Sequence, residues 1–497
     1  MNTKGHASFK KIINTVLNDI SGPDIQYVDI RITRHSWESH AADTSGSRST
    51  DSGSGSGFGV RVLRRGAWGY AASMVIDADE AIRAGRLAAD LALASSRLMS
   101  RPVRLAPVQP LDTTWIAPVV EDPFALATEF KLDFLVNSLG IASQVRGIGG
   151  VSGSMEFRRL EQWFASSEGS RIRQEIIIPA FAMTIRAGDG RGAQTRSWPS
   201  SHGGYTCTGG FEKIRSMVRR EAVEQAAGEA VMLTTAPPCP EGRFPVVLAP
   251  DQMSLQIHES IGHPLELDRV FGVEANFSGT SFAQPEGMGQ LQFGSPLINV
   301  VTDPTESGVL GAYGYDDDGV PARPVTLIRD GILRGYLSGR ETAGRLGVPS
   351  SANNRAADWR HYPINRMSNT RLEPGNATWD DLLAGAEGGL IMATNRSWSI
   401  DDRRESFRFE CEAAWEIKSG KRGKIYRNPA YTGRTLDFWR SCDAVGHAAL
   451  YENWGTPNCG KGEPSQSIHT SQGSAPARFQ NVSVSASGQR KGHPHGG

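Results

Sequence analysis

The chain has 497 residues and is long enough for two or three domains, each with its own core. Its 53 basic side chains balance 53 acidic ones, so its charge indicates neither nucleic acid nor an anionic membrane as a partner. No run approaches the roughly eighteen apolar residues of a membrane span, and the N-terminal segment lacks the apolar core of a signal peptide. The five cysteines are widely spread without a C-x-x-C pair, so we expect no disulfide framework and a cytoplasmic location.

The first half of the chain, residues 1–235, is predicted to be a domain of mixed helices and strands. Hydrophobic periodicity and helix caps predict these elements in chain order: an amphipathic helix at the start, a strand at 26–35, two strands at 58–74, helices at 77–95 and 122–145, strands at 150–166 and 171–187, and a helix at 211–230. The Ser/Gly-rich segment 45–57 is too polar to pack, and we expect a mobile loop there. The Pro-rich segment 234–245 predicts a domain boundary.

The second half, residues 240–485, has a different pattern. It begins with a short strand and one helix, and continues with short strands separated by Gly-containing turns, such as the turn at Asp330-Gly331. We therefore expect an α+β protein, with an N-terminal α/β domain followed by a mostly antiparallel β domain that carries the metal-binding helix described below. Residues 486–497 are predicted to be a flexible tail.

That helix contains the segment QIHESIGHPLELD, residues 256–268, in which His258, Glu259 and His263 lie within six positions. Neutral imidazoles are good zinc ligands, and a catalytic zinc keeps one position open for water. Glu259 is placed to take a proton from such a water. The motif is similar to the H-E-x-x-H signature of zinc peptidases, with one additional residue before the second histidine.

The additional residue requires a local distortion. Residues i and i+5 of a regular α-helix lie about 140° apart around the axis, so two histidines at this spacing would not converge on one ion. A one-residue π-bulge would bring them together. Gly262 removes a side chain at this point, and Pro264 cannot donate a hydrogen bond to the Ser260 carbonyl. The sequence therefore predicts a widened turn, whereas the alternative is a surface helix with two solvated histidines.

Other polar residues have weaker support as parts of a site. Glu266 is interpreted as a group that orients a histidine, and a solvated helix face is the alternative for Glu266 and Asp268. The acidic segment 315–319, YDDDG, favours a turn over a cation site. Four cysteines are predicted to be structural, and three histidines have no motif that places them in the site: Cys207, Cys239, Cys411 and Cys442, and His361, His447 and His469.

Several separated motifs resemble the TldD/PmbA family of metallopeptidases. The segment HESIGHPLELD is similar to the active-site helix of that family. Further similar segments occur in the family's order: GFGVRVLRRGAWGYAAS (57–73), GGYTCTGGFE (203–212), YDDDGVPARPVTLIRDGILRGYLSGRETA (315–343), INRMSNTRLEPG (364–375) and PNCGKGEPSQSIHTSQGSAPARFQNVSV (457–484). The chain departs from the family where CGKGEPSQ carries extra residues and VSASG replaces a final Val-Gly-Gly, which places substrate choice in doubt.

The resemblance implies a ligand set. The two motif histidines and the cysteine of the Cys-Gly-Lys stretch would hold one zinc ion per subunit, which gives His258, His263 and Cys459, with Glu259 as the general base. A lone cysteine is more often a small buried residue, although Pro457 and Gly460 predict a tight loop that suits a distant ligand. Motif-lacking members of the family serve as partner subunits, so we expect a homodimer or a heterodimer with such a paralogue.

The leading hypothesis is a zinc-dependent amide or peptide bond hydrolase that acts on unfolded or extended peptides. One alternative keeps this chemistry but takes a small amide-containing metabolite or peptide conjugate as substrate. Another is a non-catalytic peptide-binding partner subunit that has retained the histidines. An oxidoreductase is disfavoured because two imidazoles and a thiolate suit zinc well.

Overall fold

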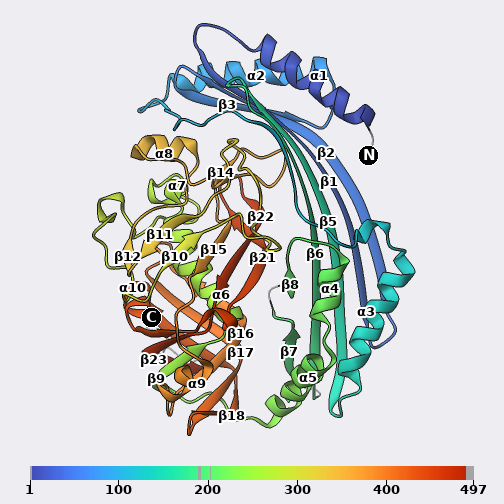
Figure 1. Ribbon diagram of the computed structural model, residues 1–497, viewed down its shortest axis with the longest axis vertical. Helices are drawn as coiled ribbons and strands as arrows, with labels where there is room; N and C mark the ends of the chain where they lie inside the picture. The colour runs from blue at the N-terminus through green and yellow to red at the C-terminus, as the bar shows by residue number, and fades with distance from the viewer. Residues whose placement is uncertain (1–2, 189–191, 202, 488–497) are drawn as a thin grey trace, which may run out of the picture.

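The computed structural model describes residues 3–188, 192–201 and 203–487, with side-chain detail from residue 9 onward, and its strands form a long N-terminal sheet and two C-terminal sheets (Figure 1). The long strands of the N-terminal sheet arch along one side of the C-terminal unit, while α1 and α2 lie on the outer side of this arch (Figure 1). The predicted α+β class is confirmed, since helices accompany sheets that are mostly antiparallel. The tail predicted at 486–497 lies outside the described residues from 488 onward.

The N-terminal sheet has eight strands in the order β3-β2-β1-β5-β6-β4, with β7 and β8 also paired to β6. Its strands are β1 (Ile25–Asp43), β2 (Arg48–Arg64), β3 (Ala67–Ser73), β4 (Asp112–Ile116), β5 (Ile148–Ser166), β6 (Arg171–Ala187), β7 (Gln194–Trp198) and β8 (Tyr205–Thr206). Its helices are α1 (Thr3–Asp19), α2 (Ala78–Ser96), α3 (Thr128–Ser143), α4 (Phe211–Met217) and α5 (Arg220–Thr235). The single helix predicted at 211–230 is therefore wrong, because the chain leaves the helical conformation at Val218 between α4 and α5.

The prediction of a mobile loop at 45–57 is also wrong. Most of this segment belongs to β2, which pairs with β1 from Arg48 to Arg64. Glycines at alternate positions share one face of the strand, and that face receives large aromatic side chains. A Cβ atom at Gly53 would lie 2.1 Å from the Trp37 ring, and one at Gly57 would lie 2.2 Å from Nε1 of Trp359. The aromatic rings thus supply the packing that the Ser/Gly composition lacks.

The C-terminal unit contains two sheets. One has the order β12-β11-β10-β15-β22-β21, and the other has the order β16-β9-β23-β19-β17-β18 with β20 beside β23. The first comprises β10 (Val300–Thr302), β11 (Val325–Arg329), β12 (Ile332–Leu333), β15 (Asn369–Leu372), β21 (Glu452–Lys461) and β22 (Gln466–Ser474). The second comprises β9 (Gly242–Leu248), β16 (Leu390–Ile400), β17 (Ser406–Lys418), β18 (Lys421–Arg427), β19 (Pro429–Arg434), β20 (Cys442–Val445) and β23 (Ala477–Ala486). A separate short pair joins β13 (Asn354–Arg355) and β14 (Ile364–Asn365).

One hydrophobic core joins the two C-terminal sheets to the predicted helix, α6 (Pro250–Ile257). The core includes Met253 and Ile257 of α6, Phe479 of one sheet and Val300 of the other. Shorter helices complete the unit: α7 (Leu267–Val270), α8 (Arg340–Leu346), α9 (Trp379–Ala384) and α10 (Thr435–Arg440). Helix α6 has only eight residues, so it depends on packing against the two sheets for its stability and its position.

Buried ion pairs join the N-terminal sheet to the acidic turn at 315–319. Arg31 Nη1 donates to Asp317 Oδ2 at 2.6 Å, and Arg61 Nη2 donates to Asp318 Oδ1 at 2.8 Å. The turn prediction is confirmed, since the backbone N–H groups of Asp318 and Val320 both donate to Asp316 Oδ1. The carboxylates beside this turn therefore hold the two units together.

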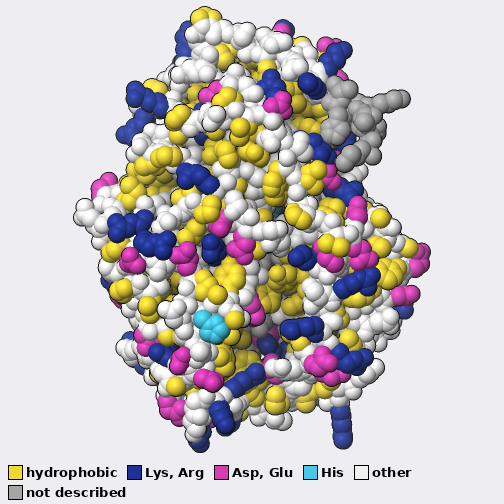
Figure 2. All heavy atoms as spheres, in the orientation of Figure 1, with side chains coloured by type: hydrophobic (Ala, Val, Ile, Leu, Met, Phe, Trp, Pro, Cys, Tyr) yellow, Lys and Arg dark blue, Asp and Glu magenta, His cyan; other side chains and the backbone are white. Residues whose placement is uncertain are grey.

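On the face that Figure 2 shows, basic and acidic side chains are interspersed. None of the described helices is long and apolar enough to span a membrane. The five cysteines are free and buried, as expected for a chain without a disulfide framework.

Candidate metal centre

The motif histidines lie where α6 changes its hydrogen-bonding pattern. His258–Gly262 form one π-helical turn directly after α6. The N–H of His263 donates to the carbonyl of His258, five positions back instead of four. This confirms the widened turn that the histidine spacing predicts, and it places both imidazoles on one side of the helix.

Two features of the sequence favour this turn. Met367 occupies the space beside Gly262, where an added Cβ would lie 1.9 Å from the methionine sulfur. Pro264 follows as part of a short 3₁₀ turn, His263–Leu265, that ends the helix. Only glycine fits at position 262 without displacing Met367, so the close packing depends on this residue.

A buried polar ladder holds the other side of the helix. Gln252 donates to the Tyr431 hydroxyl at 2.9 Å, and that hydroxyl donates to Gln256 at 3.0 Å. Gln256 Nε2 and Trp439 Nε1 both lie 2.9 Å from the hydroxyl oxygen of Ser260, inside the π turn. These bonds fix the rotation of the helix, and with it the direction of the histidines.

The structure brings His258, His263 and Cys459 together. Each offers one ligand atom, and the three atoms lie within 4.8 Å of one another. Cys459 Sγ lies 3.5 Å from His263 Nε2, close to the separation of about 3.6 Å that zinc bond lengths and tetrahedral geometry give. Cys459 lies on β21, whose pairing with β22 brings it from far along the chain to the end of α6.

The donor set fits a zinc ion. All three side chains are buried, and Nδ1 of His258 has no hydrogen-bond partner although it is shielded from solvent. Buried imidazole nitrogens normally find a partner, and a bound cation would supply one. Two imidazoles and a thiolate form a three-ligand set of the kind that leaves a fourth position free.

Charged neighbours favour the thiolate form of Cys459 and the protonated form of His263. Burial alone would raise the pKa of the Cys459 thiol, but His258 and Arg366 outweigh burial and hold this pKa well below its ordinary value. Burial alone would lower the pKa of His263, but Cys459 and Glu266 raise it to about 9. A thiolate is the form of cysteine that binds metals.

Glu266 fixes the orientation of His263. Its Oε2 atom lies 2.9 Å from Nδ1 of His263, which leaves Nε2 directed toward Cys459. Glu266 is fully buried, and Lys461 Nζ lies 3.4 Å from the same oxygen. The interpretation of Glu266 as an orienting group therefore agrees with the geometry, which matches a carboxylate–histidine–metal arrangement.

Asp268 is also buried and belongs to the same network. Its Oδ1 accepts a hydrogen bond of 2.5 Å from Lys461 Nζ, and its Oδ2 accepts one of 3.1 Å from the Asn365 backbone. The alternative of a solvated helix face is wrong for both acidic residues, because both are buried and pair with the lysine of the Cys-Gly-Lys stretch.

Glu259 lies beside the centre and is oriented from the β16–β17 hairpin. Arg404 Nη1 donates to Glu259 Oε2 at 3.1 Å, and the Trp398 side chain donates a further hydrogen bond. Burial alone would raise the pKa of Glu259, but His263, His258 and Arg404 outweigh it and lower this pKa. The carboxylate is therefore ionised at neutral pH, as a general base requires.

The three histidines without motif support lie outside the cluster. His361 pairs with Asp358, His447 accepts a hydrogen bond from the Ala449 backbone, and His469 faces Arg355. The other cysteines are also buried, and burial raises the pKa of Cys207, Cys239 and Cys442 to about 12. These observations agree with their predicted structural roles.

Sequence reasoning missed two residues of the site, Arg404 and Lys461. Arg404 lies in a turn without any motif, so no local pattern indicates it. Lys461 stands two positions after Cys459, and this proximity was an available signal.

Comparisons with known proteins place the chain in a family. Residues 241–486 match the PmbA/TldA metallopeptidase C-terminal domain, and residues 28–94 match PmbA/TldA metallopeptidase domain 1. The chain is 30% identical over 476 residues to a metalloprotease of Methanothermobacter thermautotrophicus, which covers 95% of this chain and 98% of that relative. It is 29% identical over 419 residues to Metalloprotease MJ0996 of Methanocaldococcus jannaschii, with 84% and 89% covered.

The fold agrees with this assignment. The structure is similar to the crystal structure of TldE from Thermococcus kodakarensis, with a TM-score of 0.69, 16% sequence identity, and coverage of 96% of this chain and 100% of the other. The sequence matches, extending over nearly the whole chain, show that this protein belongs to the PmbA/TldD family of metallopeptidases.

Proposed function

We propose that this protein is a zinc-dependent hydrolase of amide or peptide bonds, with one zinc ion per subunit and extended peptides as substrates. The observation that carries the proposal is the convergence of His258, His263 and Cys459 beside an ionised Glu259. The metalloprotease names of its relatives support the reaction class.

The ligand set determines what the centre supplies. When bound to two imidazoles and a thiolate, zinc acts as a Lewis acid toward a scissile carbonyl and acidifies a water in its open position. A thiolate donates more charge than a third imidazole, so we expect a modest peptidase. Glu266 and the lysine beside it keep the His263 ring in one orientation, with Nε2 available as a ligand.

Glu259 performs the proton transfers. Its carboxylate accepts a proton from the attacking water and then delivers that proton to the leaving amine. Arg404 and Trp398 hold the carboxylate in place for both steps. An ionised, oriented base contributes about 100- to 10,000-fold to the rate of such reactions.

Extended peptides suit a protein that is rich in strands, because an extended chain can pair its backbone with the edge of a strand. Recognition of this kind depends on the main chain and tolerates many side chains. We also propose that the chain works as a homodimer or with a motif-lacking paralogue, and light scattering of the purified protein, alone and with such a paralogue, tests this.

The test of the proposed reaction uses zinc-loaded protein and a mixture of unstructured peptides, with products identified by mass. We expect new termini that appear only without chelator, and Glu259→Gln should retain zinc while turnover falls at least 100-fold. A second assay contains small amide-containing conjugates. If these are cleaved while the peptides stay intact, the result would instead support a metabolite substrate. If wild type and Glu259→Gln leave every peptide and conjugate intact, the hydrolase proposal is wrong.

A further inference from the structure

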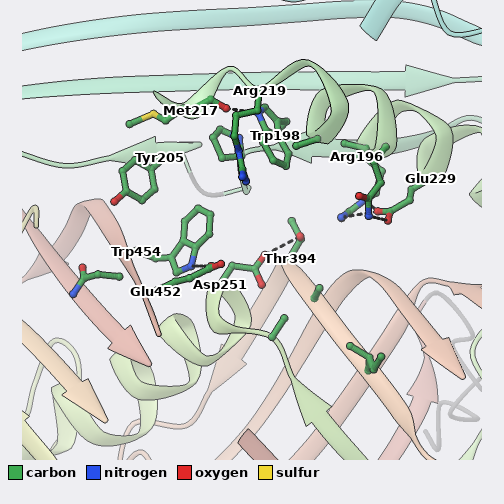
Figure 3. Close-up of a pocket in the computed structure, with 18 of the residues that line it drawn as sticks. Arg196, Trp198, Tyr205, Met217, Arg219, Glu229, Asp251, Thr394, Glu452 and Trp454 are labelled. Atoms are coloured by element: carbon green, nitrogen blue, oxygen red, sulfur yellow. Dashed lines mark hydrogen bonds and ion pairs between the residues drawn. The ribbon is translucent and has the colours of Figure 1, made fainter. Parts of the chain in front are cut away.

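A cavity of about 760 Å³ lies between the N-terminal and C-terminal units (Figure 3), and the described residues that line it include none of the metal centre. Helix α5 and strand β7 form one wall, while the start of α6, β16 and β21 form the other. Asp251 at this cavity and His258 at the metal centre are seven residues apart on one helix, which corresponds to about 10 Å. The cavity is thus a second candidate site, distinct from the hydrolytic one.

One end of the cavity has a structural role. Arg196 pairs with Glu412 at 2.7 Å and with Glu229 at 3.2 Å, and Arg422 lies over the Trp415 ring at 3.7 Å. These charges satisfy one another and link α5 to the second C-terminal sheet. They leave little free hydrogen-bonding capacity for a ligand.

The other end presents two carboxylates without a paired cation. Asp251 accepts from the hydroxyls of Thr394 at 2.8 Å and Ser200 at 3.3 Å, and Glu452 accepts from Trp454 Nε1 at 3.0 Å. Among the described residues, neither carboxylate has a Lys, Arg or His within ion-pair distance, and their partners are neutral. Burial raises the pKa of Asp251, and desolvation by the surrounding protein together with the nearby Asp251 raises the pKa of Glu452, although the Glu452 side chain reaches solvent. A cationic group between the two carboxylates would stabilise their ionised forms.

Arg219 faces these carboxylates across the cavity, which Lys213 also lines, while the charge of Arg196 acts on Asp251 from the other end. Arg219, which precedes α5, enters between Tyr205 and Trp198 and is directed toward Glu452 and Trp454 (Figure 3). Its side chain forms neither a hydrogen bond nor an ion pair with any of the described residues, although its charge acts on Glu452 at longer range. A free guanidinium in an aromatic cleft is suited to a carboxylate.

Aromatic rings enclose the space between the opposed charges. Tyr205 and Trp454 contact each other edge to face, with ring centroids 5.3 Å apart, and Trp198 is fixed by a 3.1 Å hydrogen bond from Nε1 to the Met217 carbonyl. Indole faces attract ammonium groups and pack against apolar side chains. The volume lies within the range of about 300–1,000 Å³ that holds small ligands.

We propose that this cavity binds a zwitterionic α-amino acid or short peptide with a free amino group and a free carboxylate. The ammonium lies between Asp251 and Glu452 against Trp454, the carboxylate lies on Arg219, and the apolar part packs between Trp198 and Tyr205. Such a ligand would bridge the two units, because the arginine and the carboxylates come from opposite sides of the cleft. The site does not depend on the proposed hydrolysis.

The test is calorimetric titration of the zinc-loaded full chain with three probes that contain no amide bond: L-phenylalanine, phenethylamine and 3-phenylpropanoate. Because each charge contributes a charge-assisted hydrogen bond, we expect phenylalanine to bind about tenfold or more tighter than either singly charged compound. Arg219→Met should reduce phenylalanine affinity to that of phenethylamine, and Glu452→Gln should reduce it toward that of 3-phenylpropanoate.

Arg243→Met is the matched control, because it removes one positive charge from a residue outside the cavity whose side chain donates a hydrogen bond to the Asn481 carbonyl. It should bind all three probes as wild type does. Arg219 and Glu452 are exposed, so their variants should fold, and thermal unfolding checks this. If a variant unfolds at a lower temperature than wild type, Arg219→Lys or Glu452→Asp is used in its place. Equal binding of the three probes, no binding of phenylalanine up to about 10 mM, or unchanged affinity in the test variants would overturn the proposal.

Discussion

The sulfur of Cys459 lies 3.5 Å from Nε2 of His263, although 196 positions separate the two residues. Their meeting depends on β21, which carries the cysteine, and on the π turn that directs the histidine toward it. The centre therefore needs both elements, the strand that carries Cys459 and the π turn that precedes His263. Glu266 and Gly262 support this arrangement of side chains, and Arg404 positions the base beside it.

Replacing Glu266 with glutamine should weaken metal binding without removing a ligand. The amide keeps the size of the side chain but loses the negative charge that orients and polarises His263, and such changes cost about 10- to 100-fold in affinity. Competition with a chromophoric chelator measures the loss. Glu286→Gln, on a partly exposed short helix, is the control and should bind zinc normally. Equal affinities in the two variants would show that Glu266 has no role in the centre.

Gly262→Ala should distort the π turn. Its new Cβ would overlap Met367, and overpacking of this kind costs about 1–3 kcal/mol of unfolding free energy. Gly228→Ala is the matched control, because a Cβ at this helical glycine meets nothing within 4 Å and should stabilise by up to about 1 kcal/mol.

Denaturant unfolding and zinc affinity are measured together for these glycine variants. Adding Met367→Ala to Gly262→Ala should restore part of the zinc affinity, since it reopens the space that the new methyl group needs. An alanine at 262 with normal stability and normal affinity would mean that the turn does not require glycine.

Arg404→Met should alter catalysis through Glu259. The arginine helps to lower the pKa of this carboxyl, so without it the pKa rises. Because the base must be ionised, activity that disappears as pH falls should disappear at a higher pH in the variant. The measurement is the pH profile of kcat/KM. Arg403→Met, in which the neighbouring arginine pairs only with Glu405 at the surface, should keep the wild-type profile. Identical profiles for both variants would contradict the role of Arg404.

The sequence predicted the parts of the site that depend on local spacing. The i to i+5 spacing of the two histidines, with Gly262 and Pro264 on either side of the second, predicts a widened turn, and the structure has one. Only the resemblance to a family predicts Cys459 as a metal ligand, since no local pattern relates a residue on β21 to the end of α6. Arg404 was missed for the same reason: a turn far along the chain carries it to Glu259.

Most of the fold followed from periodicity, and the errors have physical causes. Polar composition suggested a loop at 45–57, but tertiary packing overrode it, because Trp37 and Trp359 fill the alternate glycine positions of β2. The break between α4 and α5 at Val218 leaves no sequence signal such as proline or glycine. Buried charge networks, such as Lys461 with Asp268, depend on long-range packing that a pattern of local hydrophobicity does not encode.

X-ray absorption at the zinc edge tests the central claim most directly, by comparing wild type with Cys459→Ser. The account predicts one sulfur at about 2.3 Å and two imidazole nitrogens at about 2.0 Å in wild type. In the serine variant the sulfur shell should disappear while zinc affinity falls. A wild-type spectrum without sulfur, or one that Cys459→Ser leaves unchanged, would contradict a centre built from His258, His263 and Cys459.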